Sequence, residues 1–136
     1  MDGFFVGGFL YNPKTKSVLL QKRDMKAEFN PGLWSFFGGS SENNETPEQC
    51  LVRELKEELS IEIDPGKIEP LRSYFNEKFQ RQSYIFVIES ELKKSEMVLN
   101  EGEDFDWIPL TKVLELNLTE NTRKSLEVLI ERIGQK

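Results

Sequence analysis

One stretch limits the fold of this chain more than any other: a double glycine, Gly38–Gly39, and a polar loop lead into a clearly marked amphipathic helix. Thr46 is a good N-cap, Pro47 suits the first helical position, and Gln49 stands three residues after the cap, completing a capping box. At about 100° per residue the apolar residues share one arc: Leu51, Val52, Leu55 and Leu59. The adjoining arc carries three carboxylates: Glu54, Glu57 and Glu58. We therefore expect a helix that packs on a sheet and presents carboxylates at its edge.

The three carboxylates have a chemical problem that a metal ion would solve. Glu54 and Glu58 are four residues apart, so their Cβ atoms lie about 5–6 Å from each other on a helix, with Glu57 beside them. Like charges this close repel and raise one another's pKa values. Mg²⁺ prefers oxygen ligands and commonly joins protein carboxylates to substrate phosphates. The sequence predicts Mg²⁺ here, with Mn²⁺ as a substitute; the alternative is a solvated acidic helix face.

Arg53 lies on the flank of this cluster, and its position indicates that it supports a neighbouring carboxylate. It can pair with Glu57 one helical turn later, or it can reach back to Glu45 in the preceding loop. Either contact would orient the carboxylates without touching a metal ion directly. Both alternatives are open from the sequence.

The remaining residues predict a mixed α/β fold. Strands are expected at residues 4–11, 17–21, 33–37, 68–75, 83–89 and 105–108, with a weaker one at 97–99. Gly7–Gly8 indicates a bulge or a close backbone approach within the first strand. Thr111 is expected to cap a short helix through Leu116, and Thr119 a longer one. The longer helix has an apolar face with helical spacing: Leu126, Leu129, Ile130 and Ile133.

Composition excludes several classes of function. The 136 residues fit one domain over 1–136, and a net charge of −6 argues against nucleic acid as a partner. With no histidine there is no histidine base or histidine-ligated metal, and Cys50 alone cannot form an intrachain disulfide, so a reducing, cytoplasmic setting is expected. The longest apolar run is far short of the roughly 18 residues of a membrane span, so no membrane partner is expected.

Residues 39–61 resemble the Nudix box, whose pattern is G-x5-E-x7-R-E-U-x-E-E-x-G-U, where U is a bulky aliphatic residue. Eight residues stand at the required spacing: Gly39, Glu45, Arg53, Glu54, Leu55, Glu57, Glu58 and Ile61. The departure is Ser60, which replaces a glycine that ends the helix in a left-handed conformation. That conformation costs a non-glycine residue about 1 kcal/mol, so we expect a small loss of stability rather than of activity.

The resemblance implies a Nudix α/β/α sandwich, similar to small MutT-like members, and an activity. Nudix hydrolases use divalent metal ions to cleave a nucleoside diphosphate linked to another group. Carried onto this chain, Glu57 and Glu58 are the main metal ligands, and Glu54 is the base or a further ligand. The resemblance adds other candidate ligands or supporting residues: the Gly38 carbonyl, Glu45, and Glu101 or Glu103 from a later loop.

The substrate is less well defined by the sequence. Arg23 is a candidate phosphate contact, and Trp34 or Phe36 could stack on a base, although alternation along a strand places at least one ring in the core. The expected partner is a small nucleotide, either a nucleoside triphosphate or a nucleotide sugar. A Nudix-like domain that senses a nucleotide without cleaving it is the alternative function. The sequence leaves a monomer and a homodimer open.

Overall fold

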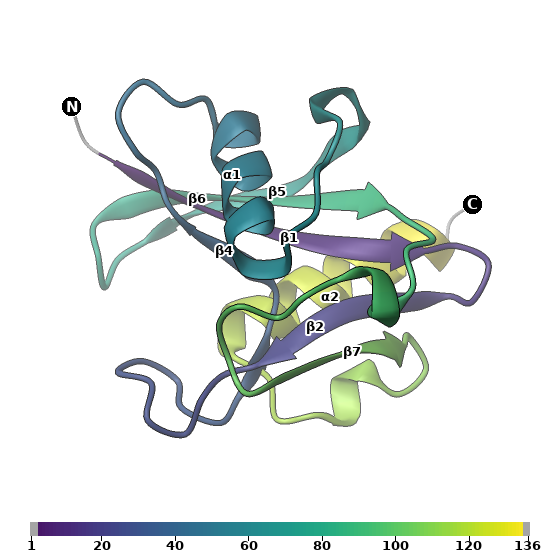
Figure 1. The fold of residues 1–136 in the computed structure, drawn as a ribbon. Coiled ribbons are helices and arrows are strands. Elements are labelled where there is room, and N and C mark those ends of the chain that lie inside the picture. The colour runs from purple at the N-terminus through teal and green to yellow at the C-terminus, as the bar shows by residue number, and fades with distance from the viewer. Residues whose placement is uncertain (1–2, 135–136) are drawn as a thin grey trace.

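The computed structural model describes residues 3–134, which form a seven-stranded mixed sheet between two helices (Figure 1). The strands are β1 (Phe4–Asn12), β2 (Ser17–Lys22), β3 (Trp34–Ser35), β4 (Phe37–Ser40), β5 (Ile68–Asn76), β6 (Arg81–Glu89) and β7 (Asp104–Pro109). The helices are α1 (Pro47–Leu59) and α2 (Glu120–Gly134), with 3₁₀ turns η1 (Pro65–Lys67), η2 (Lys94–Glu96) and η3 (Val113–Glu115). The predicted fold class, a mixed sheet packed between helices, is confirmed.

Strand β1 organises the sheet because it pairs with three other strands. Along one edge it runs parallel to β6, from Phe4 opposite Gln82 onwards. On its other edge it pairs with β2 only at the hairpin end, and β4 takes over further back, with Phe37 opposite Gly8. Strand β2 diverges to pair with β3 and β7. This fork places the double glycine of β4 against the middle of the sheet.

The two adjacent glycines of β1 allow close packing on both faces of the sheet. A Cβ on Gly7 would lie 2.6 Å from a ring carbon of Phe36, and one on Gly8 would lie 3.0 Å from the Leu51 side chain. The register with β6 runs through both glycines without a shift. Of the two predicted alternatives, the structure therefore has the close approach rather than the bulge, and α1 packs directly on the β1 backbone.

Each helix covers its own apolar core. The α1-side core contains Val6, Leu10, Phe37, Leu51, Leu55, Leu59, Phe86 and Ile88, among others. The α2-side core includes Phe9, Val18, Leu20, Ile85, Val87, Leu126 and Leu129. Figure 1 shows the two helices on opposite faces of the sheet. Within residues 3–134, neither helix has the length and apolarity needed to cross a bilayer.

The ends of α1 form as the sequence predicts. The Gln49 N–H donates to Thr46 Oγ1 at 3.2 Å, and the Thr46 N–H donates to Gln49 Oε1 at 2.9 Å, which is the predicted capping box. At the other end Ser60 is left-handed, with φ 57° and ψ 37°, and its N–H donates to the Lys56 carbonyl. At the start of α2, Thr119 Oγ1 accepts a hydrogen bond from the Thr122 N–H.

Three predicted elements are wrong in extent or type. The strand at 33–37 is two short strands that divide at Phe36, because β3 pairs with β2 and β4 pairs with β1. Residues 97–99 are not a strand, since the Val98 N–H donates to the carbonyl of Leu59 at the end of α1 rather than to a neighbouring strand. The predicted helix from Thr111 to Leu116 shortens to the turn η3, which Thr111 does not cap.

Candidate functional site

Arg53 is the centre of a hydrogen-bond network at the edge of α1. Its Nε donates to Glu45 Oε2 at 2.6 Å and its Nη2 to Glu45 Oε1 at 3.1 Å, so this ion pair is bidentate. Its Nη1 donates to Glu54 at 3.1 Å and to Glu57 at 3.2 Å, and its Nη2 also donates to the Ser40 carbonyl at 2.9 Å. Both partners left open by the sequence are therefore used. The hydrogen bonds from Arg53 lower the pKa of Glu45.

Glu58 is a buried carboxylate without a countercharge. Its side chain is on the sheet side of α1, the residue is 4% exposed, and its Oε2 accepts a hydrogen bond from the Gly38 N–H at 3.1 Å. Among residues 3–134 no Lys or Arg forms an ion pair with it. Burial raises the pKa of Glu58 to about 8, and the negative charges of Glu54 and Glu101 add to the shift.

Glu54 and Glu57 complete the cluster at different depths. The Glu54 side chain is 13% exposed and the Glu57 side chain 57% exposed. A Cβ on Gly39 would overlap the Glu54 carboxylate, so a larger residue here would displace that carboxylate from its present position. Burial raises the pKa of Glu54, and the charge on Arg53 opposes that effect.

Strand β4 and a later loop complete the surroundings of the cluster. Gly38 lies opposite Gly7 in the sheet, where a Cβ would overlap the Val6 carbonyl; its own carbonyl stays a predicted ligand. In the later loop, Glu103 pairs with Lys22 at 3.4 Å. Glu101 lies near enough to the cluster for its negative charge to contribute to the raised pKa values of Glu54 and Glu58. The structure thus brings Glu101, and not Glu103, towards the carboxylates.

The residues present fit a divalent cation in their chemistry, although they do not yet converge on one point. No set of three His, Cys, Asp or Glu side chains within residues 3–134 is arranged to hold a metal ion. The reason is visible in the contacts: Arg53 draws Glu54 and Glu57 to itself, while Glu58 turns to the Gly38 amide. A buried carboxylate that lacks a countercharge, next to two more carboxylates, is a donor set for a hard cation.

The three predicted substrate residues make their contacts elsewhere than with these carboxylates. Arg23 Nε donates to the Phe29 carbonyl at 2.9 Å, so it braces its own loop. Trp34 and Phe36 both pack against the α2-side core, and the Phe36 ring meets the Phe9 ring edge-on with centroids 5.7 Å apart. The structure therefore uses the two predicted stacking rings mainly for packing.

An exposed aromatic cluster was missed by the sequence analysis. The Phe79 ring lies 5.4 Å from the Phe5 ring and 5.3 Å from the Phe29 ring, both edge-on. Lys78 Nζ lies 4.6 Å from the Phe29 centroid, and Arg81 Cζ lies 5.3 Å from the Phe5 centroid. These residues come from β1, the β2–β3 loop and the β5–β6 hairpin. No local pattern could reveal this cluster, because only the sheet topology brings the three segments together.

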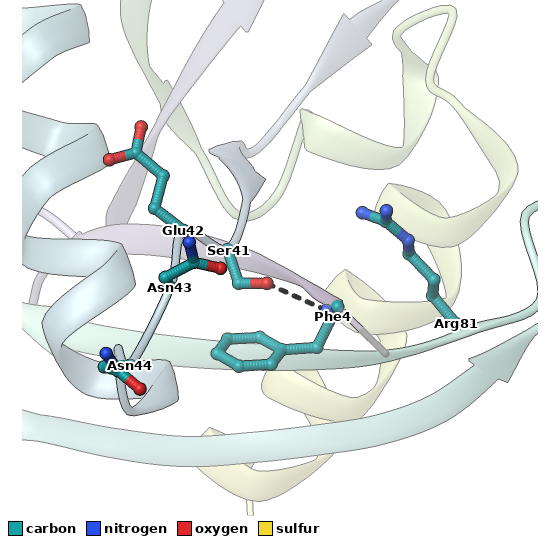
Figure 2. Close-up of a pocket in the computed structure, with 7 residues that line it drawn as sticks. Phe4, Ser41, Glu42, Asn43, Asn44 and Arg81 are labelled. Carbon is teal, nitrogen blue, oxygen red and sulfur yellow. Dashed lines mark hydrogen bonds between the residues drawn. The ribbon is translucent and has the colours of Figure 1, made fainter. Parts of the chain in front are cut away.

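Ser40 connects the aromatic cluster to the carboxylates. Arg81 Nη1 donates to Ser40 Oγ at 3.1 Å, and the Ser40 carbonyl accepts from Arg53. A cavity of about 350 Å³ lies beside this connection, lined by Gly3, Phe4, Ser41, Glu42, Asn43, Asn44 and Arg81 (Figure 2). Glu42 also pairs with Arg53 at 3.4 Å, so the cavity adjoins the carboxylate network. A larger groove of about 800 Å³ between residues 62–69 and 88–96 contains none of the predicted site residues.

The NUDIX domain model matches residues 3–129. The chain belongs to the Nudix family. An 8-oxo-dGTP diphosphatase of Proteus vulgaris is 46% identical over 50 residues, which cover 37% of this chain and 44% of that protein. A CTP pyrophosphohydrolase of Escherichia coli is also 46% identical over 50 residues, covering 37% of this chain and 36% of that protein. This chain thus aligns with less than half of either relative. A dihydroneopterin triphosphate diphosphatase of Haemophilus influenzae is 28% identical over 134 residues, covering 87% of this chain and 81% of that protein.

Solved structures confirm the Nudix fold. A MutT structure, from work on the Aliivibrio salmonicida and Vibrio cholerae proteins, superposes with a TM-score of 0.79 at 20% identity, covering 96% of this chain and 98% of that chain. The NUDIX domain of Shewanella oneidensis NrtR, in complex with ADP ribose, superposes with a TM-score of 0.77 at 22% identity, covering 96% of this chain and 87% of that chain. At these identities the likeness establishes the fold alone.

Proposed function

We propose that this Nudix protein is a Mg²⁺-dependent hydrolase that cleaves a nucleoside diphosphate linked to another group, either a nucleoside triphosphate or a nucleotide sugar. The observation that carries the proposal is Glu58, a buried carboxylate without a countercharge beside Glu54 and Glu57. Burying a lone charge is costly, and a stable protein keeps such a group where a ligand compensates for it. The diphosphatase names of the relatives support the same activity.

The residues divide the chemistry among them. Glu57 and Glu58 would hold the metal, with Glu101 as a further candidate ligand. Arg53 would keep Glu54 and Glu57 in position. Bound Mg²⁺ supplies charge neutralisation for the diphosphate and a water of lowered pKa. Glu54 would be the base or a further ligand. As a base it would take the proton of the attacking water while the new oxygen–phosphorus bond forms. The bond between that phosphorus and the bridging oxygen would break, and its electron pair would leave with the departing phosphate group. A carboxylate with a raised pKa suits that role.

The aromatic cluster supports a nucleotide as the substrate. Exposed Phe29 and Phe79 offer ring surfaces for a base, and stacking of a base on an aromatic side chain contributes about 1–3 kcal/mol. Lys78 and Arg81 place positive charge beside these rings. Arg81 also donates a hydrogen bond to Ser40, whose carbonyl accepts one from Arg53 next to the proposed catalytic carboxylates. An acidic protein thereby has a local cationic path for phosphates.

Glu57→Gln tests the mechanism. It removes one charge from the cluster, so we expect hydrolysis to be abolished while the circular dichroism spectrum stays native. Glu62→Gln is the matched control, since this glutamate lies just beyond α1 and is 83% exposed. Equal turnover in the two variants would remove the proposed mechanism.

A substrate panel with Mg²⁺ tests the activity itself. It comprises nucleoside triphosphates, ADP-ribose, nucleotide sugars, dinucleoside polyphosphates and inorganic pyrophosphate, each repeated with a chelator. We expect cleavage of compounds that carry a base, no cleavage of pyrophosphate, and no activity with the chelator. Binding without cleavage across the panel would instead establish a nucleotide-sensing domain.

A further inference from the structure

The end of α1 is held by a segment that lies outside the Nudix box. The Asn100 side-chain amide donates to the Glu57 carbonyl at 2.8 Å, and its backbone N–H donates to the Glu58 carbonyl at 2.9 Å. The Val98 N–H donates to the Leu59 carbonyl at 3.0 Å. The last carbonyls of a helix have no partner within the helix, so this segment supplies them. Two of the carbonyls belong to the proposed metal ligands.

Ser60, where the Nudix pattern has glycine, adds a contact that glycine could not make. Asn100 Nδ2 donates to Ser60 Oγ at 2.9 Å as well as to the Glu57 carbonyl, which uses both hydrogens of its amide. Ser60 keeps the left-handed conformation of the pattern in spite of its cost. The departure from the pattern therefore provides an acceptor that orients Asn100.

Glu101 follows Asn100 directly, and its loop is fastened at both ends. Beyond it, the Glu103 N–H donates to the Lys22 carbonyl at 2.9 Å, and Gly102 turns the chain with φ 90°. Only Glu101 and Gly102 lie between the two anchors, so the backbone of Glu101 has little freedom. Its side chain stays exposed, and its negative charge acts on Glu58.

We propose that Asn100, held by Ser60, is a positioning residue for the metal site. It fixes the backbone of Glu57 and Glu58, and it sets the place from which Glu101 approaches the cluster. This inference rests on the proposed function, because it assigns a task to residues that support the same site. The Ser60–Asn100 pair is a feature of this chain and not of the box.

The two side-chain hydrogen bonds that Asn100 donates, to the Glu57 carbonyl and to Ser60 Oγ, form a clamp on the end of α1. Asn100→Ala removes this clamp. The matched control is Asn12→Ala, because the Asn12 side chain also makes two hydrogen bonds, in this case as the acceptor from the Lys14 and Thr15 N–H groups in the distant β1–β2 turn. The readouts are the Mn²⁺ dissociation constant by calorimetry without substrate, the unfolding temperature, and kcat and KM separately. We expect Asn100→Ala to weaken Mn²⁺ binding and to lower kcat by about tenfold each, with KM almost unchanged. Asn12→Ala should lower the unfolding temperature only.

Ser60→Gly separates positioning from stability. It restores the glycine of the pattern and relieves the left-handed strain, so the unfolding temperature should stay equal or rise. It also removes one hydrogen bond of Asn100, so Mn²⁺ affinity and kcat should fall by about threefold. A merely structural contact would move stability and activity in the same direction.

The outcomes distinguish the two levels of the proposal. If wild-type protein binds Mn²⁺ and hydrolyses a nucleotide, and both variants stay within about twofold of it, the clamp has no positioning role and the proposed function stands. If wild-type protein neither binds Mn²⁺ nor cleaves any compound, the proposed function fails and the clamp with it. Should Asn100→Ala fail to fold, Ser60→Gly alone decides.

Discussion

Helices α1 and α2 cover opposite faces of one sheet, and each buries polar side chains against it. In α2, Thr122 Oγ1 accepts from the Phe36 N–H and from the Thr119 hydroxyl. Ser125 Oγ donates to the Asn121 carbonyl and accepts from Arg72. These neutral groups are fully paired, and they serve packing.

In α1 the buried polar group is an ionisable carboxyl group that has no countercharge. Glu58 has the Gly38 amide as its hydrogen-bond donor, and it lies near the negative charges of Glu54 and Glu101. The difference between the two helices shows that a buried polar residue does not by itself indicate a functional site. A buried ionisable group without a countercharge is a better marker, because its ionised form is costly until a ligand offsets the charge.

The largest expected effect comes from Glu58→Gln. Hydrolysis should fall by at least about 100-fold, since an amide is a poor metal ligand and carries no charge. Without metal, the variant should nevertheless become more stable relative to the wild type as pH rises. A carboxyl whose pKa is raised to about 8 keeps its proton in the folded state between its ordinary pKa and pH 8, so wild-type stability falls as pH rises through that window. Glutamine removes this slope.

Urea unfolding with a chelator, at pH 5.5 and 8.5, measures that difference. The control is Glu62→Gln, whose exposed side chain should leave the slope as in the wild type. A variant with the wild-type slope would show that Glu58 does not carry the uncompensated charge, and the contrast between the helices would fail.

Arg53→Lys should have the next largest effect. Lysine cannot reproduce the bidentate pair with Glu45 together with the contacts to Glu54 and Glu57. Misplaced carboxylates should lower kcat by roughly 10- to 100-fold. The matched change on α2 is Arg132→Lys, which loses contacts to the Pro70 and Leu71 carbonyls and should leave kcat unchanged. Equal kcat losses in both variants would show a general effect of loosened helices.

Thr122→Val should have the smallest effect on activity. It removes the acceptor for the Phe36 N–H, so the free energy of unfolding should fall by about 1–3 kcal/mol. Steady-state kinetics below the unfolding temperature should give a wild-type kcat/KM. A large loss of kcat/KM would mean that α2 also reaches into the active site, and the division of labour between the helices would have to be withdrawn.

The sequence was most informative where structure depends on neighbouring residues. The capping box of Thr46 and Gln49 and the left-handed Ser60 follow from local hydrogen bonds and backbone sterics, and both were predicted correctly. Helical spacing also identified the buried face of α1, including Leu51 and Leu55. The two alternatives for Arg53 could not be separated from spacing, and the structure uses both.

What the sequence could not supply depends on partners far along the chain. The division of residues 33–37 at Phe36 follows from two different strand partners, which no local pattern contains. Residues 97–99 have strand-like composition but find helix carbonyls to bind. For the same reason Trp34 and Phe36 were chosen as stacking rings, whereas the exposed rings of Phe29 and Phe79 come together only because two loops meet. The choice between Glu101 and Glu103 also needed the position of Lys22.

Strand β1 cannot meet its parallel partner until more than half of the chain has been synthesised, because β6 begins at Arg81. Pairing over such a separation closes a long loop, and contacts of this kind form slowly. Helix α1 lies inside that loop and carries its own start signals, so it can form early. The surface beneath it stays incomplete until β6 supplies Phe86 and Ile88. A nascent chain therefore exposes the acidic helix before the sheet that it packs on is complete, and the proposed metal site is completed late in folding.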